Sequence, residues 1–90
     1  MSRFLCKIID TFWLETIGLT VATDAKSADV RLSVGEAIEL LRPDGSRLET
    51  EVAAIPRVRP RNPDQSFDFL LPRSVRKSDV PVGTEVWITK

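Results

Sequence analysis

Hydrophobic and polar residues alternate along several short segments of the chain, and this spacing predicts β-strands. The first segment, RFLCKIIDTFWL, is rich in β-branched and aromatic residues and has apolar residues on both faces. We therefore expect a strand that is covered on both sides. A helix is the alternative, because Phe4, Ile8 and Phe12 are also four positions apart. The following IGLTVAT predicts a second strand, with Gly18 as a bend or bulge.

The middle of the chain predicts a β-hairpin. In the turn sequence RPDGS, Asp44 and Gly45 supply the position that needs a positive φ. In the returning segment RLETEVAAIPRV, Glu49 and Glu51 alternate with apolar or small residues, so they are expected on the outer face. Before the hairpin, VRLSV predicts a further short strand that ends at Gly35.

The last part of the chain predicts two more strands, FDFLL and EVWIT. Pro81 biases the preceding residue toward an extended conformation, and Gly83 permits the turn into the final strand. Roughly five to seven short strands separated by turns indicate an all-β fold, either a small barrel or a sandwich. Because no repeat or linker interrupts the chain, residues 1–90 are expected to form a single domain.

Composition favours a small globular domain in a reducing compartment. The 90 residues carry thirteen basic and thirteen acidic side chains, although the stretch from Pro56 to Lys90 has a net charge of +3. Cys6 is the lone cysteine, so no disulfide can form within the chain. The apolar start of the chain is interrupted by Lys7 and Asp10, which makes it unsuitable as a signal or membrane-spanning segment. We expect a cytoplasmic protein that is not embedded in a membrane.

The residues that most enzymes use are scarce. The chain has no histidine, which is the commonest general base and zinc ligand, and no tyrosine. Cys6 would lack a histidine partner as a nucleophile and is better explained as a small apolar residue within a strand. Glu49 and Glu51 lie about 7 Å apart along a strand, which suits paired carboxylates or a divalent cation, but an exposed hairpin face explains them better. The prediction is no enzymatic activity, no metal and no cofactor.

Basic residues and one tryptophan in the last third of the chain form the candidate binding surface. The segment RVRPR places three arginines at a spacing of two, which suits phosphate or carboxylate recognition. The alternative is that charge and proline protect a sheet edge from strand addition. Trp87 lies between two core positions and should point outward, as a partner anchor or as a lid over a loop. The candidate residues are Arg57, Arg59, Arg61, Arg73, Arg76, Lys77 and Trp87.

Three segments resemble domain 2 of translational GTPases such as elongation factor Tu. FLCKIIDTFWLETIGLTVAT is similar to the opening of that domain, where an F-x-I-x-D-x-F strand leads through a glycine to a G-x-x-V strand. VRLSVGEAIELL resembles its V-x-V-G-E-x-I-E-L segment, and FLLPRSVRKSDVPVGTEVW resembles its closing segment, with one extra residue near Pro72 and Arg73. The resemblance spans most of the chain in the same order. It implies a six- or seven-stranded antiparallel β-barrel.

In the GTPases this domain contacts the GTP-binding domain and, in elongation factor Tu, the aminoacyl end of tRNA. No GTP-binding domain accompanies the segments here, so the resemblance does not imply GTP hydrolysis. Balanced charge and few stacking aromatics favour a protein-interaction or scaffold role, with an unknown protein or a second copy of the chain as partner. The alternative is RNA or ribonucleoprotein binding through the arginine-rich surface.

Overall fold

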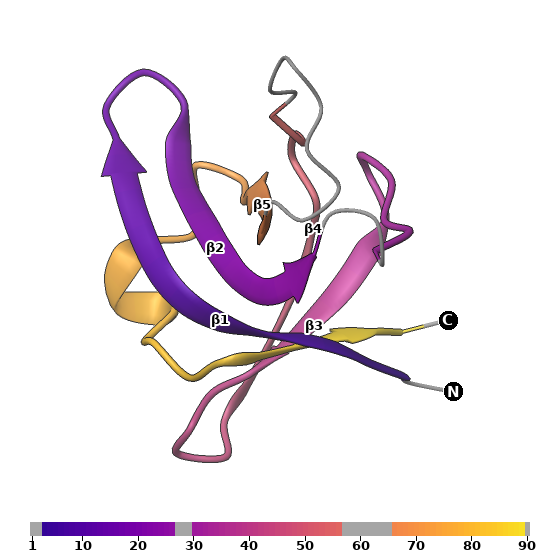
Figure 1. The fold of residues 1–90 in the computed structure, drawn as a ribbon. Helices are drawn as coiled ribbons and strands as arrows, with labels where there is room; N and C mark the ends of the chain where they lie inside the picture. Colours follow the sequence, from indigo (N-terminus) through magenta and orange to yellow (C-terminus); the bar gives the residue numbers. More distant parts are fainter. Residues whose placement is uncertain (1–2, 27–29, 57–65, 90) are drawn as a thin grey trace.

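Six antiparallel β-strands form one sheet in the computed structural model, which describes residues 3–26, 30–56 and 66–89 (Figure 1). The strands are β1 (Arg3–Leu14), β2 (Gly18–Lys26), β3 (Ala37–Leu41), β4 (Arg47–Glu51), β5 (Ser66–Leu70) and β6 (Glu85–Ile88). Their order across the sheet is β4-β3-β6-β1-β2-β5, and a short 3-10 turn, η2 (Lys77–Asp79), precedes β6. The prediction of an all-β fold is confirmed.

Strand β1 pairs with β6 on one side and with β2 on the other, so the helix alternative for this segment is wrong. Cys6 and Ile8 are buried and point into the interior, while Ile9 and Phe12 are about half exposed. The expectation that both faces are covered is therefore also wrong. The register with β6 shifts between Phe4 and Cys6, and the register with β2 shifts after Ile8. Such bulges change which side chains point outward along a strand.

The β3–β4 hairpin forms as predicted. Its register runs from Ala37 opposite Glu51 to Leu41 opposite Arg47. Gly45 has a φ of 90°, which is the conformation that glycine tolerates best. Glu49 and Glu51 are exposed, as the alternation indicates.

The strand predicted for residues 30–34 is absent. Leu32 is buried, but Val34 is 62% exposed and lies in a turn with Gly35, whose φ is 86°. The Ser33 amide donates to the Glu36 side chain at 3.1 Å, and the Glu36 amide donates to the Ser33 carbonyl at 3.1 Å. These local hydrogen bonds reverse the chain, so an extended strand cannot form there.

The two outer elements of the sheet approach each other through an isolated bridge between Ala54 and Leu70. Ala53 donates to the Leu70 carbonyl at 2.9 Å, and Leu70 donates to the Ala54 carbonyl at 2.8 Å. Ala54 lies beyond the end of β4 and Leu70 is the last residue of β5, so among the described residues no continuous ladder links β4 to β5. A closed barrel therefore stays a prediction.

The core lies on the inner side of the curved sheet, and aliphatic residues dominate it. Each strand except β4 contributes fully buried apolar side chains, and the connection between β5 and β6 adds Val75 and Val80. The largest fully buried side chains are Phe69, Ile8, Leu19, Ile38, Leu40 and Leu71. Such interiors pack closely, so the loss of one methylene group lowers the free energy of unfolding.

Two neighbouring isoleucines of β1 provide a matched test of this arrangement. Ile8 is 0% exposed and Ile9 is 51% exposed. Ile8→Val should lower the free energy of unfolding by about 0.5–1.5 kcal/mol, because it leaves a small void in the core. Ile9→Val should change it by less than about 0.5 kcal/mol. Urea unfolding followed by circular dichroism measures both values, and equal losses would contradict the orientation assigned to β1.

Candidate functional site

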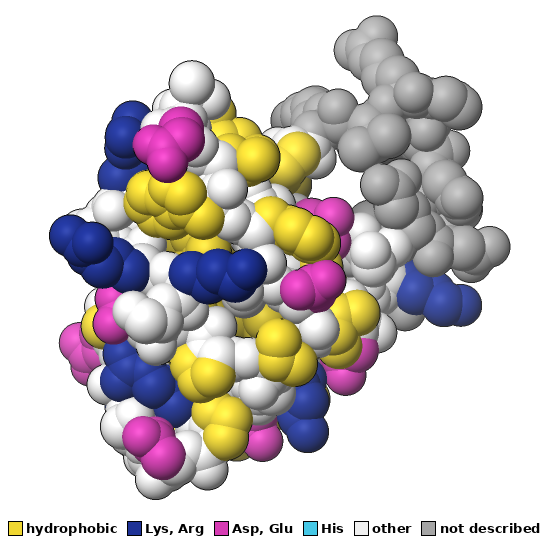
Figure 2. Space-filling model, turned by 90° about the vertical axis from the view of Figure 1, so that its left-hand side faces the viewer, with side chains coloured by type: hydrophobic (Ala, Val, Ile, Leu, Met, Phe, Trp, Pro, Cys, Tyr) yellow, Lys and Arg dark blue, Asp and Glu magenta, His cyan; other side chains and the backbone are white. Residues whose placement is uncertain are grey.

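Four large apolar side chains are exposed at the end of the β1–β2 hairpin. Phe12 is 50% exposed, Trp13 37%, Leu14 46% and Ile17 45%. We call these four residues the hairpin patch. Figure 1 shows the turn between β1 and β2 at an outer corner of the molecule, and Figure 2 shows hydrophobic side chains between charged groups on the adjoining face.

The hairpin patch is exposed because the hairpin extends past the core. Trp13 lies opposite the buried Leu19, so its ring is on the inner side of the sheet, at the rim of the core. Phe12 lies opposite Thr20 on the outer side, and nothing in the described ranges covers its ring completely. Both faces of the hairpin end therefore present apolar surface to solvent, and surface of this kind often marks a contact site.

Arg73, a predicted binding residue, forms hydrogen bonds that stabilise the turn of the same hairpin. Its guanidinium donates to the Glu15 carbonyl at 3.1 Å and, at 3.5 Å, to the Thr16 carbonyl. A side chain at Gly18 would lie 3.3 Å from the Cγ of Arg73, so glycine permits this close approach. The φ of Gly18 is 98°, which explains the bend predicted there. Arg73 thus positions the hairpin patch.

Arg76 and Lys77 lie in the connection that contains η2. The Arg76 amide donates to the Asp79 carboxylate at 3.0 Å, and the Asp79 amide donates to the Arg76 carbonyl at 2.9 Å. The buried Val75 and Val80 anchor this connection on either side of the turn. Both basic side chains are exposed, so they remain available to a ligand.

Trp87 lies on the outer face of β6, as predicted, and is half-buried there. Its ring meets that of Phe4 edge to face, with centroids 5.6 Å apart and planes at 73°. The indole Nε1–H donates to the Glu85 carboxylate at 3.0 Å. We call Phe4 and Trp87 the aromatic pair.

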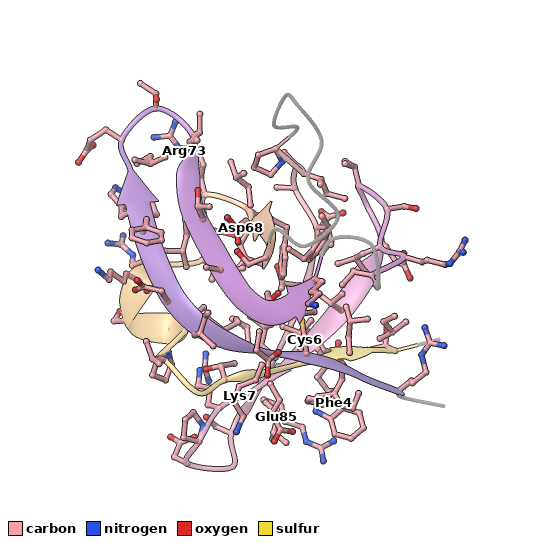
Figure 3. The ribbon with its side chains drawn as sticks, in the orientation of Figure 1. Phe4, Cys6, Lys7, Asp68, Arg73 and Glu85 are labelled. Atoms are coloured by element: carbon pink, nitrogen blue, oxygen red, sulfur yellow. The ribbon has the colours of Figure 1, made fainter. Side chains whose placement is uncertain are left out.

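The described candidate residues do not form one surface. Figure 3 shows Phe4 and Glu85 below the sheet, whereas Arg73 is beside the β1–β2 turn at the opposite end of the molecule. Trp87 therefore lies far from Arg73, since it contacts Phe4. Arg57, Arg59 and Arg61 fall outside the described residues, so their prediction stays untested.

Glu49 and Glu51 border an open depression of about 470 Å³, which Thr50, Ser74 and Thr89 also line. In the described ranges no group of three or more His, Cys, Asp or Glu residues could hold a metal ion. Hydroxyl groups and two exposed carboxylates line this depression together with apolar side chains, and its described lining residues include no nucleophile with a partnered base.

Cys6 is a buried thiol within the core. Desolvation raises its pKa from the ordinary 9.0 to about 11, although a hydrogen bond with Thr23 acts in the opposite direction and the nearby charge of Asp24 adds to the rise. The thiolate is the nucleophilic form, so a raised pKa makes Cys6 unreactive at neutral pH.

Sequence reasoning missed the hairpin patch and the partner of Trp87. One signal was present: Phe12, Trp13 and Leu14 are consecutive, so a strand cannot bury all three on one face. The pairing of Phe4 with Trp87 gave no local signal, because it depends on the register between the first and last strands.

Comparison with protein families, with curated proteins and with solved structures found no match to this chain. Within the ranges that the structure describes, no helix has the length and apolar character needed to cross a bilayer.

Arg73→Lys tests the role of Arg73. The guanidinium of arginine uses two separate nitrogens in a fixed plane for the two carbonyls, whereas lysine has a single nitrogen on a flexible chain, so the hairpin turn should open more often. The amide of Ile17, which donates to the Leu14 carbonyl at 3.1 Å, should exchange with solvent about 3–10-fold faster. Hydrogen exchange measured by NMR gives the rate, and Lys77→Gln serves as the control that leaves it unchanged. An unchanged rate in Arg73→Lys would show that the bonds do not hold the turn.

The pKa of Cys6 predicts how stability depends on alkaline pH. Between pH 9 and about 11 the unfolded chain loses the thiol proton while the folded chain keeps it. The free energy of unfolding should therefore fall as the pH rises through this window. Cys6→Ala should show a shallower decline over the same window, measured by urea unfolding at each pH. Parallel curves for the two proteins would contradict the raised pKa.

Proposed function

We propose that this chain is a non-enzymatic binding module that acts by contacting another protein. The hairpin patch is the observation that carries the proposal. Its four side chains are 37–50% exposed and lie at one end of a long hairpin, on both of its faces. Tryptophan and other large aromatic side chains are enriched at the energetic centres of protein interfaces.

The energetics favour a contact at this position. Completing the burial of a half-exposed Phe or Leu would contribute about 1 kcal/mol for each residue. The Arg73 guanidinium holds the turn in place, which lowers the entropy lost when a partner binds. Glu15, an exposed charged residue in the turn of the hairpin, would contribute to the polar rim that interfaces usually have.

RNA binding remains the alternative function. Arg73 adds little support for it, because its guanidinium already bonds to backbone carbonyls, which leaves Arg76 and Lys77 as the described basic candidates. A relationship to domain 2 of translational GTPases also remains a proposal. It rests on the three sequence segments and is compatible with the six antiparallel strands. The lone cysteine supports a cytoplasmic location.

A charged residue within the hairpin patch tests the proposed function. Leu14→Glu should weaken binding of the partner by about 10-fold or more, because a carboxylate would be placed in an apolar contact. Val34→Glu is the matched control, since Val34 is 62% exposed and lies outside the patch. Sedimentation of the purified chain measures self-association, and quantitative affinity capture measures other partners.

Capture that is lost in Leu14→Glu and retained in Val34→Glu supports the proposal, provided that both variants keep the wild-type circular dichroism spectrum. Equal capture by both variants and by the wild-type chain would remove the hairpin patch as the contact. Capture abolished by ribonuclease would favour the RNA alternative instead.

A further inference from the structure

The outer face of β1, β6, β3 and β4 carries the aromatic pair within a regular cross-strand row. Phe4 lies opposite Trp87, Trp87 opposite Glu39, and Glu39 opposite Glu49. Directly opposed side chains in antiparallel strands are close enough to contact each other. The row therefore places two rings beside carboxylates on one open face of the sheet.

The two rings form a corner, because their planes are inclined at 73° and their centroids are 5.6 Å apart. Phe4 is 48% exposed, so its ring is open to a ligand, and Trp87 is half-buried beside it. The face of an aromatic ring is electron-rich and attracts a cation, most strongly when the ring is indole.

A carboxylate beside Trp87 strengthens the attraction of its ring face for a cation. Glu85 accepts the indole Nε1–H at 3.0 Å, and a negative acceptor polarises the donor group. The indole ring face becomes more negative as a result. Glu39 lies on the other side of Trp87 in the row, and its side chain is 14% exposed where it bonds to Arg47 at 3.4 Å.

Among the described residues, acidic groups outnumber basic groups on this face. Four carboxylates and two cations lie there, in contrast to the neutral balance of the whole chain. The carboxylates are Glu39, Glu49, Glu51 and Glu85, and the cations are Lys7 and Arg47. Such a face attracts a cationic ligand and repels the phosphates of a nucleic acid.

We propose that the outer face of β1, β6 and β3 binds an arginine side chain from a partner protein, at the corner between Phe4 and Trp87. The guanidinium stacks on the indole face, and the carboxylate of Glu85, which bonds to the same indole, balances its charge. This contact is separate from the hairpin patch and does not depend on it, because the two lie at opposite ends of the molecule.

The indole N–H signals of the full-length chain in a ¹⁵N-correlated NMR spectrum provide the test. The chain has two tryptophans, so Trp87 reports on the proposed site and Trp13 serves as an internal control. The probe is a blocked glycine peptide that carries two arginines. The matched peptide carries citrulline, which keeps the planar shape but has no charge. The arginine peptide should shift the Trp87 signal saturably and leave that of Trp13 unchanged.

Charge variants separate attraction by the carboxylates from simple stacking. Glu85→Gln keeps an acceptor for the indole but removes the charge, so affinity for the arginine peptide should fall roughly 3-fold or more. Glu15→Gln removes a carboxylate at the hairpin and should leave the affinity unchanged. Leu14→Glu should also have no effect, so failure of this inference can be distinguished from failure of the hairpin contact.

Three results would overturn the proposal. The first is no saturable shift at Trp87, and the second is an equal shift with the citrulline peptide. The third is a Trp87 shift produced by a single-stranded oligonucleotide, which would assign the face to nucleic acid.

Discussion

The pairing of β1 with two neighbours is the constraint on which the rest of the structure depends. The backbone amide of Ile8 donates to the Thr84 carbonyl at 2.8 Å, and the Ile8 carbonyl accepts from the Gly83 amide at 2.9 Å. On its other side, Ile8 lies opposite Thr23 of β2. This strand joins the β3–β4–β6 half of the sheet to the β2–β5 half. Its buried residues therefore fix the position of both halves relative to one core.

The two register shifts along β1 explain why one strand contributes to two different surfaces. Before the first shift, Phe4 faces outward beside Trp87, and after the second, Phe12 faces outward beside Thr20. Without bulges, strict alternation would keep every even-numbered residue on one face. In this strand Cys6 and Ile8 point inward instead, between two outward-facing phenylalanines.

Local patterns predicted much of the fold. Asp44 and Gly45 specify the β3–β4 hairpin, and alternation around Trp87 correctly predicts its outward position. The prediction for residues 30–34 failed because Ser33 and Glu36 form local hydrogen bonds that alternation does not encode. Periodicity indicates that Phe12, Trp13 and Leu14 cannot all be buried on one face, but it does not reveal how far a hairpin extends beyond the core, so it did not locate the hairpin patch.

The candidate site depends on long-range contacts more strongly than the strands and turns do, so it was harder to predict from the sequence. Arg73 bonds to carbonyls 57 and 58 positions earlier in the chain, and no local pattern indicates that pairing. The same holds for Phe4 and Trp87, whose contact joins the first strand to the last. A basic residue in the sequence therefore looks available for a ligand until its partners within the fold are known.

Strand β1 also sets the distance between the two proposed contacts. Phe4 and Phe12 are eight residues apart, which corresponds to about 26 Å along an extended strand. Ligands at both ends would be held apart by a stiff, hydrogen-bonded element, without steric conflict between them. Under the two proposals, β1 would therefore act as a spacer that keeps the two partners apart.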